Sequence, residues 1–273
     1  MTLEKLFLGV IMFIKEYKKD RLVCNVFSDR DSMGKYAGRQ IAEVMRKLLK
    51  CQKEINMIFA AAPSQNEVLS YLVQEKDIDW SRVIAFHMDE YIGLEKGSPK
   101  SFGYYLDNAI FKHVNMKAVY YIGTTGPSDE LCNRYEQLLK DHSIDIVCLG
   151  IGENGHIAFN DPHVADFNDC KLVKVVDLGE ECRHQQVNDK TFDTLDEVPK
   201  YAVTLTIPTL TSAKYMFCTV PTLHKASAVY HTMMDEISET VPATIMRRHE
   251  HAVMFTDVDS ASILMQKQTE ELL

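Results

Sequence analysis

The feature that most constrains the fold is an alternation of short apolar runs with longer stretches whose apolar residues recur at helical spacing. The short runs are apolar on both faces, which is typical of strands in a parallel sheet that is covered on both sides. We therefore predict an α/β fold: a single Rossmann-like domain over residues 1–273, with a mainly parallel sheet flanked by helices on both faces. The predicted strands are residues 22–27, 55–61, 83–88, 145–150, 215–220 and 252–257, and the first two predicted helices are residues 32–49 and 64–73.

Composition excludes some classes of partner. The net charge of −9 provides no positive field for nucleic acid or an anionic membrane, although a small anionic substrate needs only a few local donors. The cysteine count of seven is odd and no C-x-x-C occurs, which predicts reduced thiols in a cytoplasmic protein. The apolar run at residues 6–14 is too short to span a bilayer and no small-residue cleavage site follows it, so we expect it to belong to an amphipathic first helix.

Polar residues follow several predicted strands, at the sheet edge where ligands bind in such folds. Asp89 comes directly after the strand at residues 83–88, within "FHMDEYIGL". A partly desolvated carboxylate at that edge can act as a base on a carbon-bound proton. From spacing alone, a helix cap or a surface acidic pair explains Asp89 and Glu90 about as well as a catalytic base does.

The segment "LGIGENGHIAFNDP" follows another predicted strand and matches the G-x-G-x-x-G dinucleotide fingerprint. A true fingerprint opens a helix, but Pro162 and the Asn160-Asp161 pair follow too closely for a long one. The glycines therefore indicate a sharp turn rather than a dinucleotide site. His156 in this turn is a candidate acid–base group, although a lone histidine is more often a satisfied surface residue.

Groups able to hold an anion also stand near strand ends. Ser64 with Glu67 three residues later predicts a capping box, and the same helix end offers N–H groups to a phosphate. Lys225 and Arg183 are basic residues near strand ends that can hold one phosphate, although each alone is more often a solvated charge.

Taken together, these segments resemble the glucosamine-6-phosphate deaminase (isomerase) family, within a wider group that includes 6-phosphogluconolactonases. The resemblance runs in order from about residue 20 to residue 260. It rests on "FHMDEYIGL", "SFGYYLDNAIFKHV", "LGIGENGHIAFNDP", "VPKYAVTLTIPTL", "HKASAVYH" and "PATIMRRHEHAVMFTD".

The resemblance implies a single deaminase-like domain that acts on an amino sugar 6-phosphate. His156 matches the family's ring-opening histidine, and Asp89 matches the residue that moves a proton between C2 and C1. Water then adds at C2, and ammonia and fructose 6-phosphate leave. Asn154 and Asp161 would orient His156, at positions where aspartate and glutamate are more usual. No metal or other cofactor is implied, and the expected partner is the small-molecule substrate, with a possible homo-oligomer.

The resemblance also implies a phosphate site. Lys225 matches a phosphate-binding lysine, and Ser64 falls in the phosphate loop. That loop reads "AAAPSQ" where other members are rich in glycine and threonine, so Gln65 is expected to assist Ser64. Arg183 is the nearest candidate for the family's phosphate-binding arginine. The altered loop makes galactosamine 6-phosphate a plausible substrate as well.

Two alternatives stay open. A 6-phosphogluconolactonase-type hydrolase would be expected to carry threonine and serine after the loop's Gly-His, where this chain has Ile157 and Ala158. A non-catalytic sugar-phosphate-binding module would bind without turnover, since one fold can serve both purposes.

Overall fold

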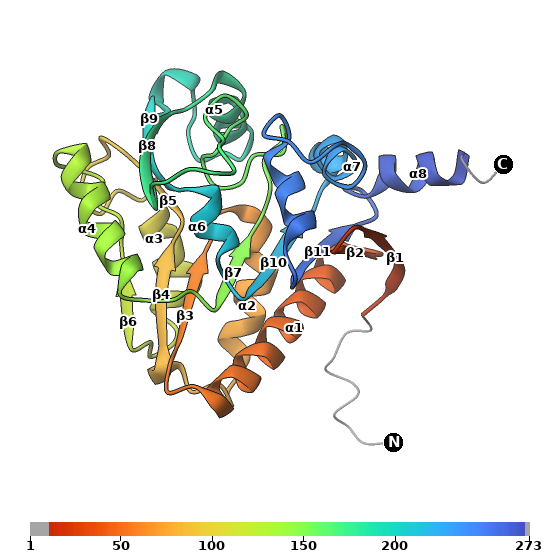
Figure 1. Ribbon diagram of the computed structural model, residues 1–273, viewed down its shortest axis with the longest axis horizontal. Coiled ribbons are helices and arrows are strands. Elements are labelled where there is room, and N and C mark those ends of the chain that lie inside the picture. Colours follow the sequence, from red (N-terminus) through yellow and green to blue (C-terminus); the bar gives the residue numbers. More distant parts are fainter. Residues whose placement is uncertain (1–10, 271–273) are drawn as a thin grey trace.

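The computed structural model describes residues 11–270 and has helices packed on both faces of a central sheet (Figure 1). Among these residues the main sheet has eight strands in the order β1-β2-β11-β10-β7-β3-β4-β6. Strand β1 pairs antiparallel with β2, and the other pairings in this sheet are parallel. The strands are β1 (Phe13–Lys19), β2 (Leu22–Phe27), β3 (Ile55–Phe59), β4 (Val83–His87), β6 (Ala118–Tyr120), β7 (Ile146–Leu149), β10 (Tyr215–Val220) and β11 (Ala252–Asp257).

Alternation along the buried strands builds a hydrophobic core on each face. In β3, Met57 and Phe59 face one core while Ile58 faces the other, as the two-residue period of a strand requires. One face is covered by α1 (Arg30–Cys51) and α2 (Asn66–Gln74). The other is covered by α4 (Ser128–Lys140), α6 (Ile207–Thr211) and α7 (Ala226–Met234).

The strand order reverses direction at the boundary between β3 and β7. From β3 the chain moves outward to β4 and β6, then returns to place β7 on the opposite side of β3 and continues to β10 and β11. Such a reversal opens a crevice beyond the carboxyl ends of the two strands, which is the usual ligand position in open parallel sheets.

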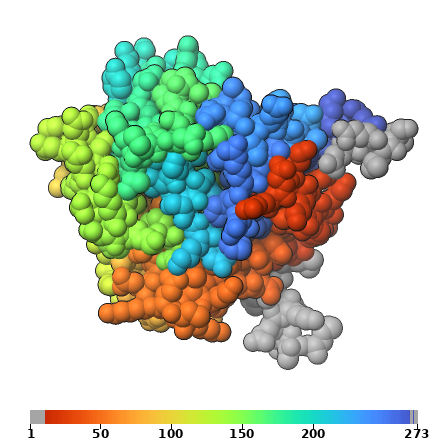
Figure 2. Space-filling view, viewed as in Figure 1, coloured from red at the N-terminus to blue at the C-terminus, as the bar shows by residue number. Residues whose placement is uncertain are grey.

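A small antiparallel sheet lies beyond β4 and was not predicted. It has the order β5-β9-β8, with β5 (Asp89–Tyr91), β9 (Tyr201–Leu205) and β8 (Val173–Asp177). Only Met88 separates β4 from β5, so the chain passes almost directly from one sheet to the other. The segment that carries β8, α5 (Glu180–Asn188) and β9 packs beside the C-terminal part of the chain, shown in green to cyan and in blue (Figure 2).

Two local predictions are wrong. Residues 1–10 lie outside the described residues, but Phe13 and Ile14 of the expected amphipathic helix belong to the edge strand β1, where their side chains are exposed. Ser64 forms no capping box, because a 3-10 turn over Pro63–Gln65 precedes α2, whose N-terminus has no side-chain cap. Among the described helices, none has the length and apolarity needed to cross a membrane.

Candidate active site

A cavity of about 360 Å³ opens at the carboxyl edge of the main sheet. Its walls come from the segments that follow four neighbouring strands, together with the C-terminal part of α5. These segments include residues 60–64 after β3, 88–89 after β4, 150–152 after β7, 221–222 after β10 and 185–186 of α5. The cavity therefore lies at the strand reversal.

The glycines of the loop after β7 serve the histidine rather than a cofactor. A Cβ atom on Gly152 would lie 2.1 Å from Cε1 of His156, so only glycine lets the imidazole pack against this backbone. Gly155 has a φ of +79°, a left-handed conformation that favours glycine. Within the described residues no helix lies between β7 and β8, so the loop lacks the helix on which a dinucleotide fingerprint depends.

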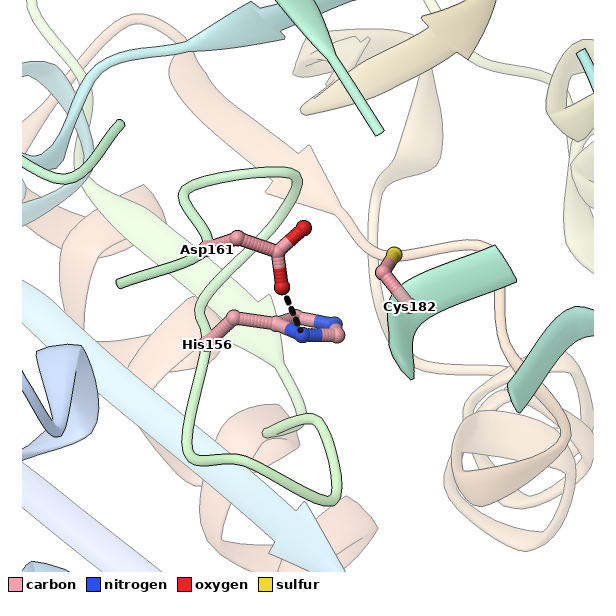
Figure 3. Close-up of side chains that lie close together, drawn as sticks. All are labelled: His156, Asp161 and Cys182. Atoms are coloured by element: carbon pink, nitrogen blue, oxygen red, sulfur yellow. Dashed lines mark ion pairs between the residues drawn. The ribbon is translucent and has the colours of Figure 1, made fainter. Parts of the chain in front are cut away.

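His156 is buried and is held through one ring nitrogen. Its Nδ1 lies 2.8 Å from Oδ1 of Asn154 and 3.0 Å from Oδ1 of Asp161 (Figure 3). Asn154 also donates from Nδ2 to the same Asp161 oxygen at 2.9 Å. Nδ1 is therefore the donor toward these two oxygens, and Nε2 is left to accept or donate a proton at the cavity.

Asp161 carries the negative charge of this group. Burial by itself would raise the pKa of Asp161, but the hydrogen bond and charge of His156, together with the Asn154 amide, outweigh burial and lower it to about 2. The carboxylate is thus ionised at neutral pH and can accept the Nδ1–H of His156.

Asp89 is the first residue of β5, and it lines the same cavity. Burial and the neighbouring charge of Glu90 raise the pKa of Asp89 well above its ordinary value. The Glu90 carboxylate turns away to accept backbone N–H groups of Phe102 at 3.1 Å and Gly103 at 2.9 Å, at the start of α3 (Phe102–Leu106). Burial outweighs these bonds and raises the pKa of Glu90 to about 7.

Strand β9 connects the Asp89 segment to the His156 loop. Asp89 pairs with Thr204 in the small sheet, and the Thr204 hydroxyl accepts the backbone N–H of Phe159 at 3.1 Å. Asn160 donates from Nδ2 to the carbonyl of Leu205 at 2.8 Å. One strand therefore anchors both segments.

The other part of the cavity is basic. Lys225 lines it and has a buried Nζ without a hydrogen-bond partner among the described residues. Burial lowers the pKa of Lys225 below its ordinary value, although the charges of Asp189 and Glu153 partly offset this effect. Ser64 also lines the cavity. A desolvated cation without a hydrogen-bond partner is poised to accept an anionic group.

Two of the predicted phosphate ligands, Gln65 and Arg183, do not line the cavity. Gln65 is buried and its Nε2 donates to the carbonyl of Leu149 at 3.0 Å and to the hydroxyl of Thr219 at 2.7 Å, so it ties strands together instead of lining the cavity. The guanidinium of Arg183 donates to the carbonyls of Leu195 and Val198, and Arg183 is absent from the cavity wall.

Arg30 lines the cavity and was missed. It begins α1, pairs with Glu67 at 2.8 Å and donates to the carbonyl of Pro63. The signal that could have found it is its position three residues after β2, at the same carboxyl edge as the other candidates.

The sequence of this chain is similar to those of a known enzyme family. A family model described as "Glucosamine-6-phosphate isomerases/6-phosphogluconolactonase" matches residues 28–255. A glucosamine-6-phosphate deaminase from Bacillus cereus (strain G9842) is 31% identical over 236 residues, 85% of this chain and 88% of that protein. A glucosamine-6-phosphate deaminase from Shouchella clausii is 34% identical over 198 residues, 71% of this chain and 78% of that protein.

Solved structures agree with these sequence relatives. A structure described as a monomeric glucosamine-6-phosphate deaminase has a TM-score of 0.79 at 26% identity, over 89% of this chain and 99% of that chain. A 6-phosphogluconolactonase from Thermotoga maritima has a TM-score of 0.70 at 23% identity, over 86% of this chain and 99% of that chain, which is a likeness of fold. With a match over most of its length and relatives above 30% identity, the chain belongs to the family of glucosamine-6-phosphate isomerases and 6-phosphogluconolactonases.

Proposed function

We propose that the protein is an amino sugar 6-phosphate isomerase and deaminase, which converts glucosamine 6-phosphate, or its galactosamine equivalent, and water into a ketose 6-phosphate and ammonia. The observation that carries the proposal is the convergence of Asp89, His156 and the unpartnered Lys225 on one cavity. The relatives above 30% identity that bear the name glucosamine-6-phosphate deaminase support the same reaction.

His156 opens the sugar ring in this proposal. Because Nδ1 is engaged by Asn154 and Asp161, Nε2 serves the ring opening. A proton goes from Nε2 to the ring oxygen as the bond between C1 and that oxygen breaks, and Nε2 takes up the C1 hydroxyl proton as the carbonyl forms. The ionised Asp161 stabilises the imidazolium form that delivers the proton to the ring oxygen, and its hydrogen bond fixes the plane of the imidazole.

Asp89 transfers the proton between carbons. Its raised pKa makes the ionised carboxylate a stronger base than an exposed aspartate, which suits removal of a weakly acidic proton from C2. The same carboxyl group then returns the proton to C1, and water adds at C2 as ammonia leaves. The steps are thus ring opening, proton transfer between carbons, addition of water and loss of ammonia.

Lys225 binds the substrate phosphate in this proposal, with Ser64 and Arg30 as the other donors on the cavity wall. A phosphate oxygen would give the Lys225 ammonium the partner that it lacks in the protein. This contact holds the sugar at its far end while Asp89 and His156 act on C1, C2 and the ring oxygen.

We further propose that the protein works in the cytoplasm. All seven cysteines are free, which suits a reducing compartment. A homo-oligomer stays a prediction, to be measured by light scattering.

The test is ammonia release from glucosamine 6-phosphate and from galactosamine 6-phosphate, assayed in parallel, with 6-phosphogluconolactone as a third compound. The proposal expects ammonia in equal amount to the ketose phosphate from at least one amino sugar. Lactone hydrolysis without ammonia release would assign the hydrolase function instead. Saturable binding of the amino sugars without any product would assign a non-catalytic module.

A further inference from the structure

Cys182 of α5 stands beside the catalytic histidine and has no part in the proposed reaction. Figure 3 shows its side chain projecting from α5 next to the Asp161 carboxylate. One ligand atom from each of Cys182, Asp161 and His156 lies within 4.8 Å of the other two, and all three side chains are buried. Oδ2 of Asp161 is buried, and the Cys182 thiol interacts with the Asp161 carboxylate through a side-chain hydrogen bond.

This donor set matches the chemistry of a zinc-type ion. Thiolate, imidazole and carboxylate are the protein ligands of Zn²⁺, at bond lengths of about 2.0 to 2.3 Å, so two ligand atoms on one ion lie roughly 3 to 4 Å apart. The Nδ1 of His156 and the Oδ1 of Asp161 are already 3.0 Å apart. The Cys182 ligand atom lies within 4.8 Å of both other ligand atoms, so the three groups can reach one ion after a modest adjustment of the site.

The charges also balance. An ionised thiolate and the ionised carboxylate together neutralise a divalent cation, which allows the ion to be buried without a large desolvation cost. The Cys182 thiol must lose its proton when a cation binds, because the thiolate is the form that coordinates a metal.

We propose that Cys182, Asp161 and His156 form an inhibitory site for a thiophilic divalent cation such as Zn²⁺. The Cys182 thiol loses its proton to solvent, the His156 proton moves from Nδ1 to Nε2, and Nδ1, a carboxylate oxygen and the sulfur bond to the ion. One proton is released for each ion bound. The ion removes the Nδ1–H bond to Asp161 and occupies the ring nitrogen through which the protein orients His156.

The cavity gives the ion a route to this site. His156 lines the cavity, and so do Gln185 and Gln186, which follow Cys182 by one turn of α5. The side-chain Oδ1 of Asn154, 2.8 Å from Nδ1, or a water molecule can complete a four-coordinate site. The inhibitory consequence rests on the proposed function, but binding of the ion does not.

The first experiment measures binding without activity. The folded protein is titrated with Co²⁺, which gives a thiolate-to-cobalt charge-transfer band when sulfur is a ligand, and Zn²⁺ is then added to displace it. The experiment uses a Cys51→Ser/Cys170→Ser background, because those two thiols are exposed and compete for the ion. We expect one cobalt per chain, with the band lost in Cys182→Ser and Cys182→Ala and kept in the background protein. Absence of the band in the folded background protein would overturn the site.

The second experiment measures inhibition of ammonia release by buffered free Zn²⁺. Loss of a direct ligand is expected to raise the half-inhibitory Zn²⁺ concentration of the Cys182 variants by about 100-fold, because loss of mere outer-shell partners already costs about 10- to 100-fold in affinity. Equal Zn²⁺ sensitivity in active Cys182 variants and in the background protein would contradict the proposal. A protein that binds cobalt through Cys182 but releases no ammonia would refute the proposed function and leave the metal site standing.

Discussion

Asp161 and Asp89 are both buried at the carboxyl edge of the main sheet, but their pKa values are shifted in opposite directions. The pKa of Asp161 is lowered to about 2 despite burial, because His156 and Asn154 donate to it. The pKa of Asp89 is raised well above its ordinary value, because burial and the charge of Glu90 act on it and no side chain donates to it among the described residues. Burial is common to both, so the donors around each carboxylate decide the direction.

The difference assigns the two residues to different tasks. A carboxylate that stays ionised can hold and stabilise a charged imidazole, whereas one with a raised pKa can take up and return a proton. Asp161 therefore supports the function of its partner, and Asp89 is left to react. The predictions below test this contrast from the largest expected effect to the smallest.

Asp89→Asn is expected to have the largest effect, a loss of about a thousandfold in kcat for ammonia release, because the amide cannot accept the C2 proton. The same change should raise the free energy of unfolding. A carboxyl group with a raised folded-state pKa loses stabilising power as pH rises through that pKa, so the ionised Asp89 costs stability at neutral pH. Steady-state kinetics and urea unfolding at pH 7 measure the two effects.

The matched control is Asp177→Asn, which alters an exposed carboxylate that pairs with His163 at 3.1 Å. It should change neither kcat nor stability by a measurable amount. An Asp89→Asn protein with kcat within a factor of ten of the wild type would remove Asp89 from the role of base.

Asp161→Asn is expected to reduce kcat by roughly 10- to 100-fold, the worth of one hydrogen bond to a charged group. Its effect on stability should have the opposite sign to that of Asp89→Asn. The folded-state pKa of about 2 lies below the ordinary 3.8, so the ionised carboxylate stabilises the fold above pH 4. The variant should lose about 2 kcal/mol at pH 7, where 1.36 kcal/mol corresponds to one pKa unit.

That difference in stability should shrink as pH falls from about 4 to about 2, where the wild-type carboxylate becomes protonated. Urea unfolding of both proteins over this range tests the expectation. A stability difference that does not change with pH would mean that the charge of Asp161 is not what stabilises the loop.

Lys225→Ala is expected to raise KM by roughly 10- to 100-fold and to change kcat much less, because it removes a charge-assisted bond to the phosphate that does not take part in proton transfer. Lys225→Arg should recover part of the affinity. The control is Lys35→Ala, which removes a lysine that pairs with Asp31 on the surface of α1. A fall in kcat at unchanged KM would place Lys225 in the chemistry rather than in binding.

Asn154→Asp is expected to have the smallest effect, a change of about threefold or less in kcat at the optimum, because the oxygen that faces Nδ1 is kept. The added carboxylate replaces the Nδ2 donor to Asp161 with a second negative charge, so the pH–rate profile of ammonia release should differ from that of the wild type. An unshifted profile would show that the asparagine and aspartate forms support the histidine equally.

The parallel sheet was predictable from the sequence because its strands are apolar on both faces. The strands at residues 22–27, 215–220 and 252–257 match the structure residue for residue, and the other predicted strands differ by one or two residues at an end. The small sheet was not predictable in the same way: β5 reads Asp-Glu-Tyr, which has neither an apolar run nor alternation, and is a strand because β9 pairs with it. The prediction of a helix at Phe13 and Ile14 was wrong because an exposed edge strand can have the composition of an amphipathic helix.

The meeting of Asp89 and His156 at one cavity could be predicted from their positions after strands, but the directions of the Gln65 and Arg183 side chains could not. Asp89 and His156 both follow strands that are neighbours of β3 in the sheet, so the strand order brings them to one cavity. Gln65 and Arg183 have the right chemistry in the right segments, but the first bonds to Thr219 and the second to loop carbonyls. Side-chain direction within a loop depends on packing partners that are distant in sequence.

Strand β9 has a consequence for how such an enzyme can diversify. Because Thr204 pairs with Asp89 and also holds the Phe159 N–H, the separation between the base and the histidine depends on one strand outside the cavity wall. Other parts of the wall, among them residues 60–64, 99–102 and 189–191, contain neither Asp89 nor His156. Substitutions there can change which sugar fits without changing the spacing of the reacting groups. The residues proposed to react and the residues that would set sugar specificity therefore lie in separate segments of the chain.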